Sequence, residues 1–207
     1  MYSFLGALLL LLSAASSFGT RPADANRTTP QFCRSSDCPK YELVKKYDTF
    51  EERNYEFSRW VSTQVEGKSY SHAIVEGFWR LYHYIDGKNT AGMKIPMTVP
   101  VLSRVNPVGE RFASNITMSF FVPFAVDVPP TPVNPEVYLS TLPAQTVYVK
   151  SFGGYAFKSD FVEKAEKLSE ELNTLGKSFK HDFFMTAGYD APFMLFNRHN
   201  EVWYIAE

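Results

Sequence analysis

Alternating apolar and polar positions recur along the chain and predict a domain rich in β-strands. The segment 60–65 (Trp-Val-Ser-Thr-Gln-Val) alternates as a half-buried strand does, and 116–122 places every second side chain on one apolar side. Two prolines interrupt the apolar segment 93–102, which we therefore expect at a sheet edge or with a bulge, because proline donates no backbone hydrogen bond. Further strands are expected over 41–44, 137–139 and 146–152.

A first amphipathic helix is expected over about 71–85, with Ser69 or Ser71 as its N-cap and Gly87 just past its end. Its apolar stripe, which we expect to face the core, consists of Ile74, Phe78, Leu81 and Ile85. The opposite face carries His72, Glu76, Trp79 and His83. A tryptophan on the outer face of a helix is uncommon, so Trp79 is a candidate for contact with a ligand.

A second helix follows in the C-terminal half, with Ser159 as its expected cap and Gly176 at its end. Its apolar stripe consists of Phe161, Ala165, Leu168, Leu172 and Leu175. The order strand, strand, helix, strand, strand thus occurs twice, over 41–122 and 136–206. This repetition predicts an α+β fold, in which an antiparallel sheet partly closes into a barrel with the helices packed outside.

The last part of the chain reads Gly188-Tyr-Asp-Ala-Pro192 and then Asn197-Arg-His-Asn-Glu-Val-Trp203. We expect a turn, a short apolar strand over 193–196, a tight turn and a closing strand over 202–205. Asn197 and Asn200 suit left-handed turn positions. On chemistry alone, this stretch is an ordinary hairpin.

The N-terminus has the pattern of a secretory signal peptide. An apolar run over 4–12 precedes small residues over 13–17, and the run is too short to span a bilayer. We therefore assign 1–19 to a signal peptide, 20–39 to a polar N-terminal arm and 40–207 to the folded domain. The expected location is extracellular.

Cys33 and Cys38 are the two cysteines of the chain, and an oxidising compartment favours a disulfide between them. We expect this small loop to lie outside the core, so that its loss hardly changes the melting temperature. A metal site would need further cysteine or histidine nearby, which the sequence lacks. Asn26 and Asn115 begin N-glycosylation sequons, which agree with secretion.

Composition narrows the functional classes. The 207 residues have a net charge of −1 at pH 7, so no basic field is present to hold nucleic acid. The 18 phenylalanines and 12 tyrosines fit either an aromatic core or a flat apolar cleft for a planar ligand. Motifs of serine hydrolases, zinc proteases and phosphate-binding loops are absent, and we predict no enzymatic activity.

Several segments together resemble the SOUL/heme-binding protein family. They are Phe50–Tyr55 with Trp60–Thr63, Tyr84–Asn89, Met93–Val101, Ser151–Tyr155 and Gly188–Trp203. The resemblance covers essentially residues 40–207. It implies a distorted antiparallel β-barrel built from two βαβ-type pseudo-repeats, with two flanking helices.

The resemblance also implies that heme or a related tetrapyrrole binds in an open apolar cleft beside the first helix. Family positions that carry cations toward the porphyrin propionates correspond here to Val75, His83 and Met194. A position that carries an iron-ligating histidine in another branch corresponds to Asn54, which cannot ligate iron. His83 and Met194 are themselves candidate iron ligands, and Trp79 could stack on a porphyrin. The alternative is a binding module for another apolar ligand or a protein partner in the same cleft.

Overall fold

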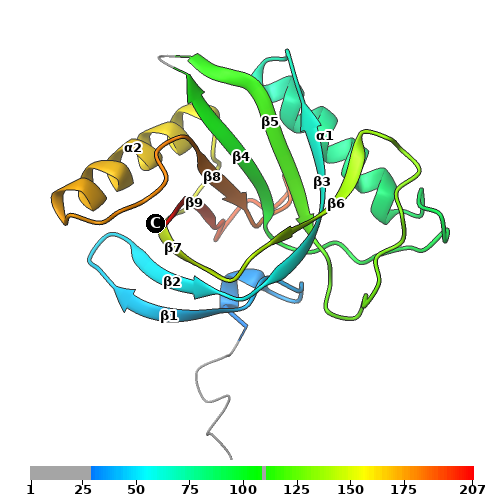
Figure 1. Cartoon of the computed structure of the whole chain (residues 1–207), viewed down its shortest axis with the longest axis horizontal. Helices are drawn as coiled ribbons and strands as arrows, with labels where there is room; N and C mark the ends of the chain where they lie inside the picture. Colours follow the sequence, from blue (N-terminus) through cyan, green and yellow to red (C-terminus); the bar gives the residue numbers. More distant parts are fainter. Residues whose placement is uncertain (1–28, 109–110) are drawn as a thin grey trace, which may run out of the picture.

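One antiparallel sheet of nine strands curls into a half-barrel, and two helices pack on its outside (Figure 1). This computed structural model describes residues 29–108 and 111–207, so the expected signal peptide and the Asn26 sequon lie outside the described residues. The elements are η1 (Gln31–Cys33), β1 (Tyr41–Lys46), β2 (Glu51–Tyr55), β3 (Ser58–Val65), α1 (Tyr70–Ile85), β4 (Val101–Val108), β5 (Arg111–Phe121), β6 (Val137–Leu142), β7 (Gln145–Phe152), α2 (Lys158–Thr174), β8 (Phe184–Gly188) and β9 (Asn200–Ile205).

The sheet order is β1-β2-β7-β9-β8-β4-β5-β3-β6. Apart from β1, the two halves of this order match. From the centre of the sheet outward, β4, β5, β3 and β6 correspond in position to β8, β9, β7 and β2. The helix α1 packs on β3 and β5, and α2 packs on their counterparts β7 and β9. The predicted α+β half-barrel of two similar halves is confirmed.

The predicted core stripe of α1 is confirmed. Leu81 and Ile85 are buried, and Ile74 and Phe78 are partly buried against the same cluster of β3 and β5 side chains. Gly77 brings the helix close to the sheet, since a Cβ there would lie 3.4 Å from the Cβ of Met118. The helix begins after Ser69 and is followed by Gly87 at a φ of 105°, as expected.

The second helix begins two residues earlier than expected. Phe157 is the N-cap, and its backbone N–H donates to Asp160 Oδ2 at 2.7 Å, so Ser159 is already inside the helix. Four of the five predicted core residues are buried, but Leu175 lies past the helix end and is 52% exposed. Gly176 follows with a φ of 64°.

Two predicted strands are wrong. The segment 93–100 is irregular, and β4 begins only at Val101, directly after Pro100. The apolar segment 193–196 lies in the loop between β8 and β9 and pairs with no strand, and its Phe193, Leu195 and Phe196 side chains are highly exposed. Asn197 has the expected left-handed φ of 52°, whereas Asn200 is a buried strand residue at the start of β9.

The Cys33–Cys38 disulfide is present, but the expectation that it lies outside the core is wrong. Both cysteines are buried and pack in the cluster inside the half-barrel that contains Trp60 and Trp203. The arm is also anchored beside the disulfide, where the Phe32 ring stacks on His199 at 4.0 Å between centroids. Residues from about 30 onward therefore belong to the folded domain.

This burial predicts a substantial loss of stability when the disulfide is removed. Replacing both Cys33 and Cys38 by alanine should lower the free energy of unfolding by about 3 kcal/mol, since the loop constraint and the packing of the arm are lost together. Urea unfolding of the oxidised wild type and the double variant measures the difference. A loss below about 1 kcal/mol would contradict the packing described for the arm.

Candidate ligand-binding surface

The outer face of α1 exposes a row of large apolar side chains. Val75, Trp79 and Tyr82 are 57%, 51% and 38% exposed. His83 is also exposed, and its ring lies 6.0 Å from that of Trp79 because residues four apart share a helix face. Three of the four residues proposed from the sequence for a ligand cleft thus lie together on one face of one helix.

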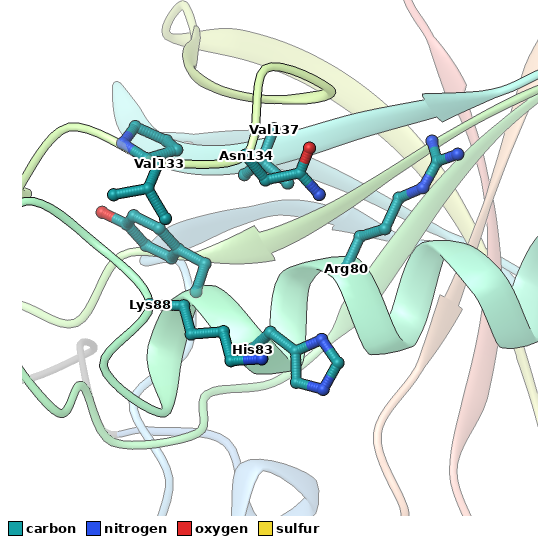
Figure 2. Close-up of a pocket in the computed structure, with 8 residues that line it drawn as sticks. Arg80, His83, Lys88, Val133, Asn134 and Val137 are labelled. Atoms are coloured by element: carbon teal, nitrogen blue, oxygen red, sulfur yellow. The ribbon is translucent and has the colours of Figure 1, made fainter.

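A cavity of about 200 Å³ lies beside the C-terminal half of α1 (Figure 2). One wall is the helix, with Arg80, His83 and Tyr84, and the opposite wall is the loop before β6, including Asn134. Lys88 also lines the cavity, and Figure 2 shows its side chain extending toward His83. The lining therefore combines apolar side chains with cationic and imidazole groups.

The turn that carries Lys88 is held in place by the side chain of Asn89. Asn89 is buried, and its amide Nδ2 donates to the carbonyls of Tyr84 and Met93. Its Oδ1 accepts from the backbone N–H of Met93 at 2.9 Å. This bonding fixes the turn after α1, and Lys88 itself is exposed with no ion pair to any described residue. Lys88 is therefore a cation available to a ligand.

Arg80 is engaged within the protein instead. Its guanidinium forms ion pairs with Glu76 at 2.6 Å and with Glu136 at 2.7 Å. The pair with Glu136 joins α1 to the loop before β6, whereas Glu76 lies on α1 itself. Arg80 thus shapes the cavity while its charge is balanced by two carboxylates.

Met194 lies in the β8–β9 loop, and the structure gives no contact between it and Val75, Trp79 or His83. Arg198 braces this loop by donating to the carbonyl oxygens of Ala191 and Met194 at 2.7 and 2.8 Å. The neighbouring Phe193 and Phe196 are 82% and 77% exposed. Of the four predicted cleft residues, the three on α1 therefore lie together, whereas Met194 lies on the apolar β8–β9 loop.

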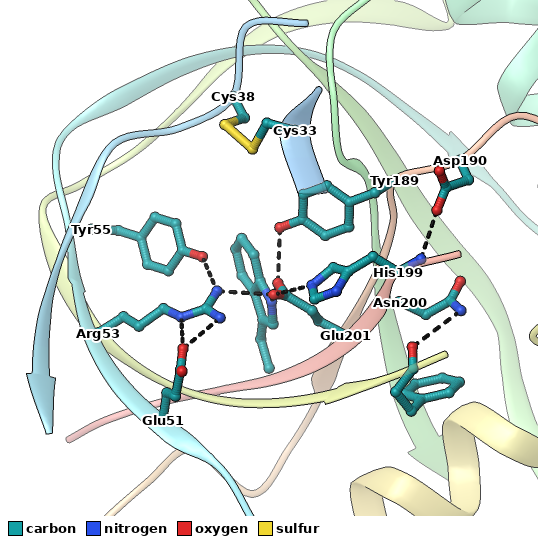
Figure 3. A network of polar contacts seen from close by, with 12 residues as sticks. Cys33, Cys38, Glu51, Arg53, Tyr55, Tyr189, Asp190, His199, Asn200 and Glu201 are labelled. Atoms are coloured by element: carbon teal, nitrogen blue, oxygen red, sulfur yellow. Dashed lines mark hydrogen bonds and ion pairs between the residues drawn. A yellow bond between two sulfur atoms is a disulfide. The ribbon is translucent and has the colours of Figure 1, made fainter. Parts of the chain in front are cut away.

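Inside the half-barrel, a buried ion pair joins Arg53 of β2 to Glu201 of β9 at 2.9 Å (Figure 3). The arginine and glutamate side chains are 2% and 0% exposed. Glu201 also accepts hydrogen bonds from the Tyr189 hydroxyl at 2.8 Å and the Trp203 indole at 2.7 Å. His199 Nε2 lies 2.8 Å from the same carboxylate. Arg53, Tyr189, Trp203 and His199 thus all bond to the Glu201 carboxylate.

This network sets the ionisation of Glu201. Burial alone would raise the pKa of the carboxyl, but the charge of Arg53 and the hydrogen bonds from His199 and Trp203 outweigh it and lower the pKa to about 2. Burial raises the pKa of Tyr55 and Tyr189 well above the usual value. At neutral pH the pair is ionised and enclosed by neutral phenols.

Three other polar side chains of interest make internal contacts. His199 is stacked on Phe32 and lies within hydrogen-bond distance of Glu201. Asn54 Oδ1 accepts from the Thr146 hydroxyl at 2.7 Å. His72 is bonded to Ser69 at 2.8 Å, on the far end of α1 from the cavity.

Within residues 29–108 and 111–207, no group of three or more histidine, cysteine, aspartate or glutamate side chains could hold a metal ion. In the same part of the chain, no helix is long and apolar enough to cross a membrane. The outer face of α1 is where three of the site residues predicted from the sequence lie together.

Comparison with known proteins identifies the family. A family model described as SOUL heme-binding protein matches residues 36–205. The chain belongs to this family. Heme-binding protein 2 of Homo sapiens is 40% identical over 159 residues, which cover 76% of this chain and 78% of the relative. Heme-binding protein 1 of Xenopus laevis is 35% identical over 158 residues, covering 75% of this chain and 83% of the relative.

Solved structures of distant proteins share the SOUL fold. The C-terminal domain of EcmrR superposes with a TM-score of 0.57 at 8% sequence identity, covering 81% of this chain and 98% of that domain. A hydrolase from Listeria innocua gives a TM-score of 0.52 at 12% identity, covering 79% and 94% of the two chains. At these identities the likeness concerns the fold alone.

Two features escaped the sequence analysis. Lys88 lies within the SOUL-like segment 84–89, and its place directly after Gly87 is the signal that puts a cation at the end of the helix face that carries His83. The alternation of His199, Glu201 and Trp203 pointed to one face of a strand, but nothing local indicated that Arg53 lies opposite them.

We expect Glu201→Gln to destabilise the protein by about 3–5 kcal/mol at pH 7, because it removes the buried counter-charge of Arg53 and leaves only the partly exposed Glu51. Since the folded-state pKa is depressed to about 2, the stabilisation is present above the unfolded-state pKa and is lost as the pH falls toward 2. The difference from wild type should therefore shrink by about 3 kcal/mol between pH 6 and pH 2.

Urea unfolding across this pH range measures the effect. Glu51→Gln is the matched control, since Glu51 pairs with Arg53 at 2.7 Å but is 25% exposed. It should cost about 1 kcal/mol or less, as a partly exposed pair does. Equal losses from the two substitutions would rule out a dominant role for the buried pair.

Proposed function

We propose that this SOUL protein is a secreted, non-enzymatic carrier that binds heme or a related tetrapyrrole on the outer face of α1. The observation that carries the proposal is the exposed Trp79, beside His83 and next to a cavity that Lys88 also lines. The relatives named above are heme-binding proteins by name, which supports the choice of ligand.

The dimensions favour an open site. A cavity of about 200 Å³ is smaller than pockets that enclose an organic ligand, which measure about 300–1,000 Å³. It can accept one edge of a porphyrin, while the macrocycle lies over Trp79 and Val75 on the helix surface. Such a site leaves much of the ligand in solvent, and we expect micromolar rather than nanomolar affinity.

The chemistry of the donors also fits. Heme presents a flat apolar surface, two carboxylates and an iron that accepts imidazole. Trp79 supplies a ring for stacking, Lys88 a cation for a carboxylate, and His83 an imidazole that makes no hydrogen bond to a described side chain. Lys88 takes the place of the cations that are missing at Val75 and Met194.

Secretion is part of the proposal and rests on the sequence pattern of 1–19 together with two structural observations. The Cys33–Cys38 disulfide is formed, which suits an oxidising compartment. Asn115, in the second sequon, is exposed on β5, where a glycan can project into solvent. Intact-mass measurement of the secreted protein before and after glycosidase treatment tests this part.

A second candidate is a non-heme apolar ligand or a protein partner on the same surface. The exposed apolar row of Val75, Trp79 and Tyr82 favours it, since apolar patches of this kind commonly meet a partner. The two candidates differ in their response to porphyrins, which makes the titration below decisive.

Titration of hemin into the mature protein should give a saturable shift of the Soret band and quenching of tryptophan fluorescence. Trp79→Ala should weaken binding about five- to tenfold, since loss of one stacked ring costs about 1 kcal/mol. His83→Ala should change the Soret spectrum if His83 ligates the iron, and Met194→Ala should leave it unchanged. Phe157→Ala, which removes an exposed aromatic near α2, is the matched control.

No Soret shift at tens of micromolar protein would refute heme as the ligand. Thermal stabilisation by lipids or bile pigments without stabilisation by hemin would favour the second candidate. If Phe157→Ala weakens binding and Trp79→Ala does not, the binding surface lies near α2 and not on α1.

Lys88→Ala should weaken binding of protoporphyrin about three- to tenfold, the value of one exposed charge-assisted contact. Binding of the dimethyl ester, which lacks the carboxylates, should be unchanged. Lys94→Ala is the control, because Lys94 is a nearby exposed lysine that pairs with Asp86 at 3.1 Å. An equal effect of Lys88→Ala on acid and ester would exclude a contact with a carboxylate.

A further inference from the structure

The segments 153–157 and 191–196, here called the apolar loop pair, lie side by side at one end of β7 and β9. The Tyr155 hydroxyl of the first segment donates to the carbonyl oxygen of Pro192 in the second at 3.1 Å. The Arg198 guanidinium lies over the same tyrosine ring, 4.4 Å from its centre. These contacts hold the two loops together as one surface.

The apolar loop pair is exposed and almost without polar side-chain groups. Phe157 and Leu195 are 70% and 64% exposed, and Phe193 and Phe196 are more exposed still. Neither segment contains a charged residue or a side-chain amide, and their one hydroxyl, that of Tyr155, is already bonded. Apolar surfaces of this kind mark places where a protein meets something other than water.

The backbone of the second loop is hydrogen-bonded within the protein. Its carbonyl oxygens accept from three side chains, those of Arg34, Tyr155 and Arg198. The accepting carbonyls belong to Asp190, Ala191, Pro192, Met194 and Asn197. A loop in water can leave its carbonyls to the solvent, whereas a medium without water requires an internal partner for each. The loop therefore has the bonding that suits a surrounding of low polarity.

We propose that the apolar loop pair inserts into the surface of a lipid bilayer and holds the folded protein there. A protein partner is met with directional hydrogen bonds, about one for each 100–200 Å² of interface, and these side chains have almost no groups to make them. A bilayer surface requires only apolar area and a backbone whose polar groups are bonded internally. The two segments carry no charge, so zwitterionic phosphatidylcholine is the lipid that they fit.

Co-sedimentation of the mature, ligand-free protein with phosphatidylcholine vesicles tests the proposal. Wild type should bind saturably. The double substitution Phe193→Ala with Phe196→Ala should weaken binding at least about tenfold, because two rings lose their apolar contact with the bilayer. Phe57→Ala is the matched control and should bind as wild type does. Phe57 is 61% exposed in the turn after β2, at the opposite end of β7, where Tyr55 pairs with Gln145.

Two further measurements separate insertion from other causes. Binding should change less than about twofold between about 50 and about 500 mM salt, because no charge in the apolar loop pair is screened. Vesicles of brominated lipid should quench the added fluorescence of Phe193→Trp and not that of Phe57→Trp. All variants should melt as wild type does, since the replaced side chains are on the surface.

The proposal fails if wild type does not bind phosphatidylcholine vesicles at millimolar lipid. Binding that requires anionic lipid and disappears at high salt would also overturn it, as would binding that is lost in Phe57→Ala or Trp79→Ala but kept in the double variant. A self-association of wild type that the double variant abolishes, without any binding to vesicles, would assign the surface to a second copy of the chain instead.

Discussion

The ion pair between Arg53 and Glu201 is the constraint on which the interior of this protein depends. It links β2 to β9 across the intervening strand β7, and both side chains are almost completely buried. A buried charge is tolerated only when its counter-charge and hydrogen bonds are complete, and here Tyr189, Trp203 and His199 complete them. Phe32 then covers His199, so the N-terminal arm seals the same network and the disulfide holds the arm in place.

The filled interior is the reason that we propose a ligand site on the outside of the molecule. Barrels of other proteins often hold ligands within the lumen, but here the corresponding space is taken by the ion pair and its aromatic surroundings. The outside of the sheet is covered by α1 and α2, and of these α1 has the exposed Trp79 beside His83. We therefore propose that the tetrapyrrole binds on the helix surface, and we expect the buried residues of the Asn197–Trp203 segment to support the fold.

The sequence predicted the parts of the fold that depend on local periodicity. The stripe of Leu81 and Ile85 and the glycine after each helix were correct because burial and helix ending follow from side-chain spacing and left-handed φ values. The segment 193–196 was predicted as a strand because its residues are apolar, but a strand also needs a neighbour, which periodicity does not report.

The same distinction applies to the sites. Trp79 and His83 could be assigned to one helix face from their spacing, and the structure places them so. The burial of Cys33 and the pairing of Arg53 with Glu201 could not be predicted, because they join segments separated by most of the chain. Lys88 was within reach of sequence reasoning, as the first cation after the helix end.

A ligand bound on the outer face of α1 should leave the interior of the protein unchanged. The most direct test is NMR chemical-shift mapping of the isotope-labelled protein with the diamagnetic gallium complex of protoporphyrin. We expect the shift changes to concentrate at Val75, Trp79, His83 and Lys88, and the indole N–H resonance of Trp203, which is bonded to Glu201, to stay in place. Shift changes that concentrate at Trp203 and Tyr55, with α1 unaffected, would contradict a site on the helix surface.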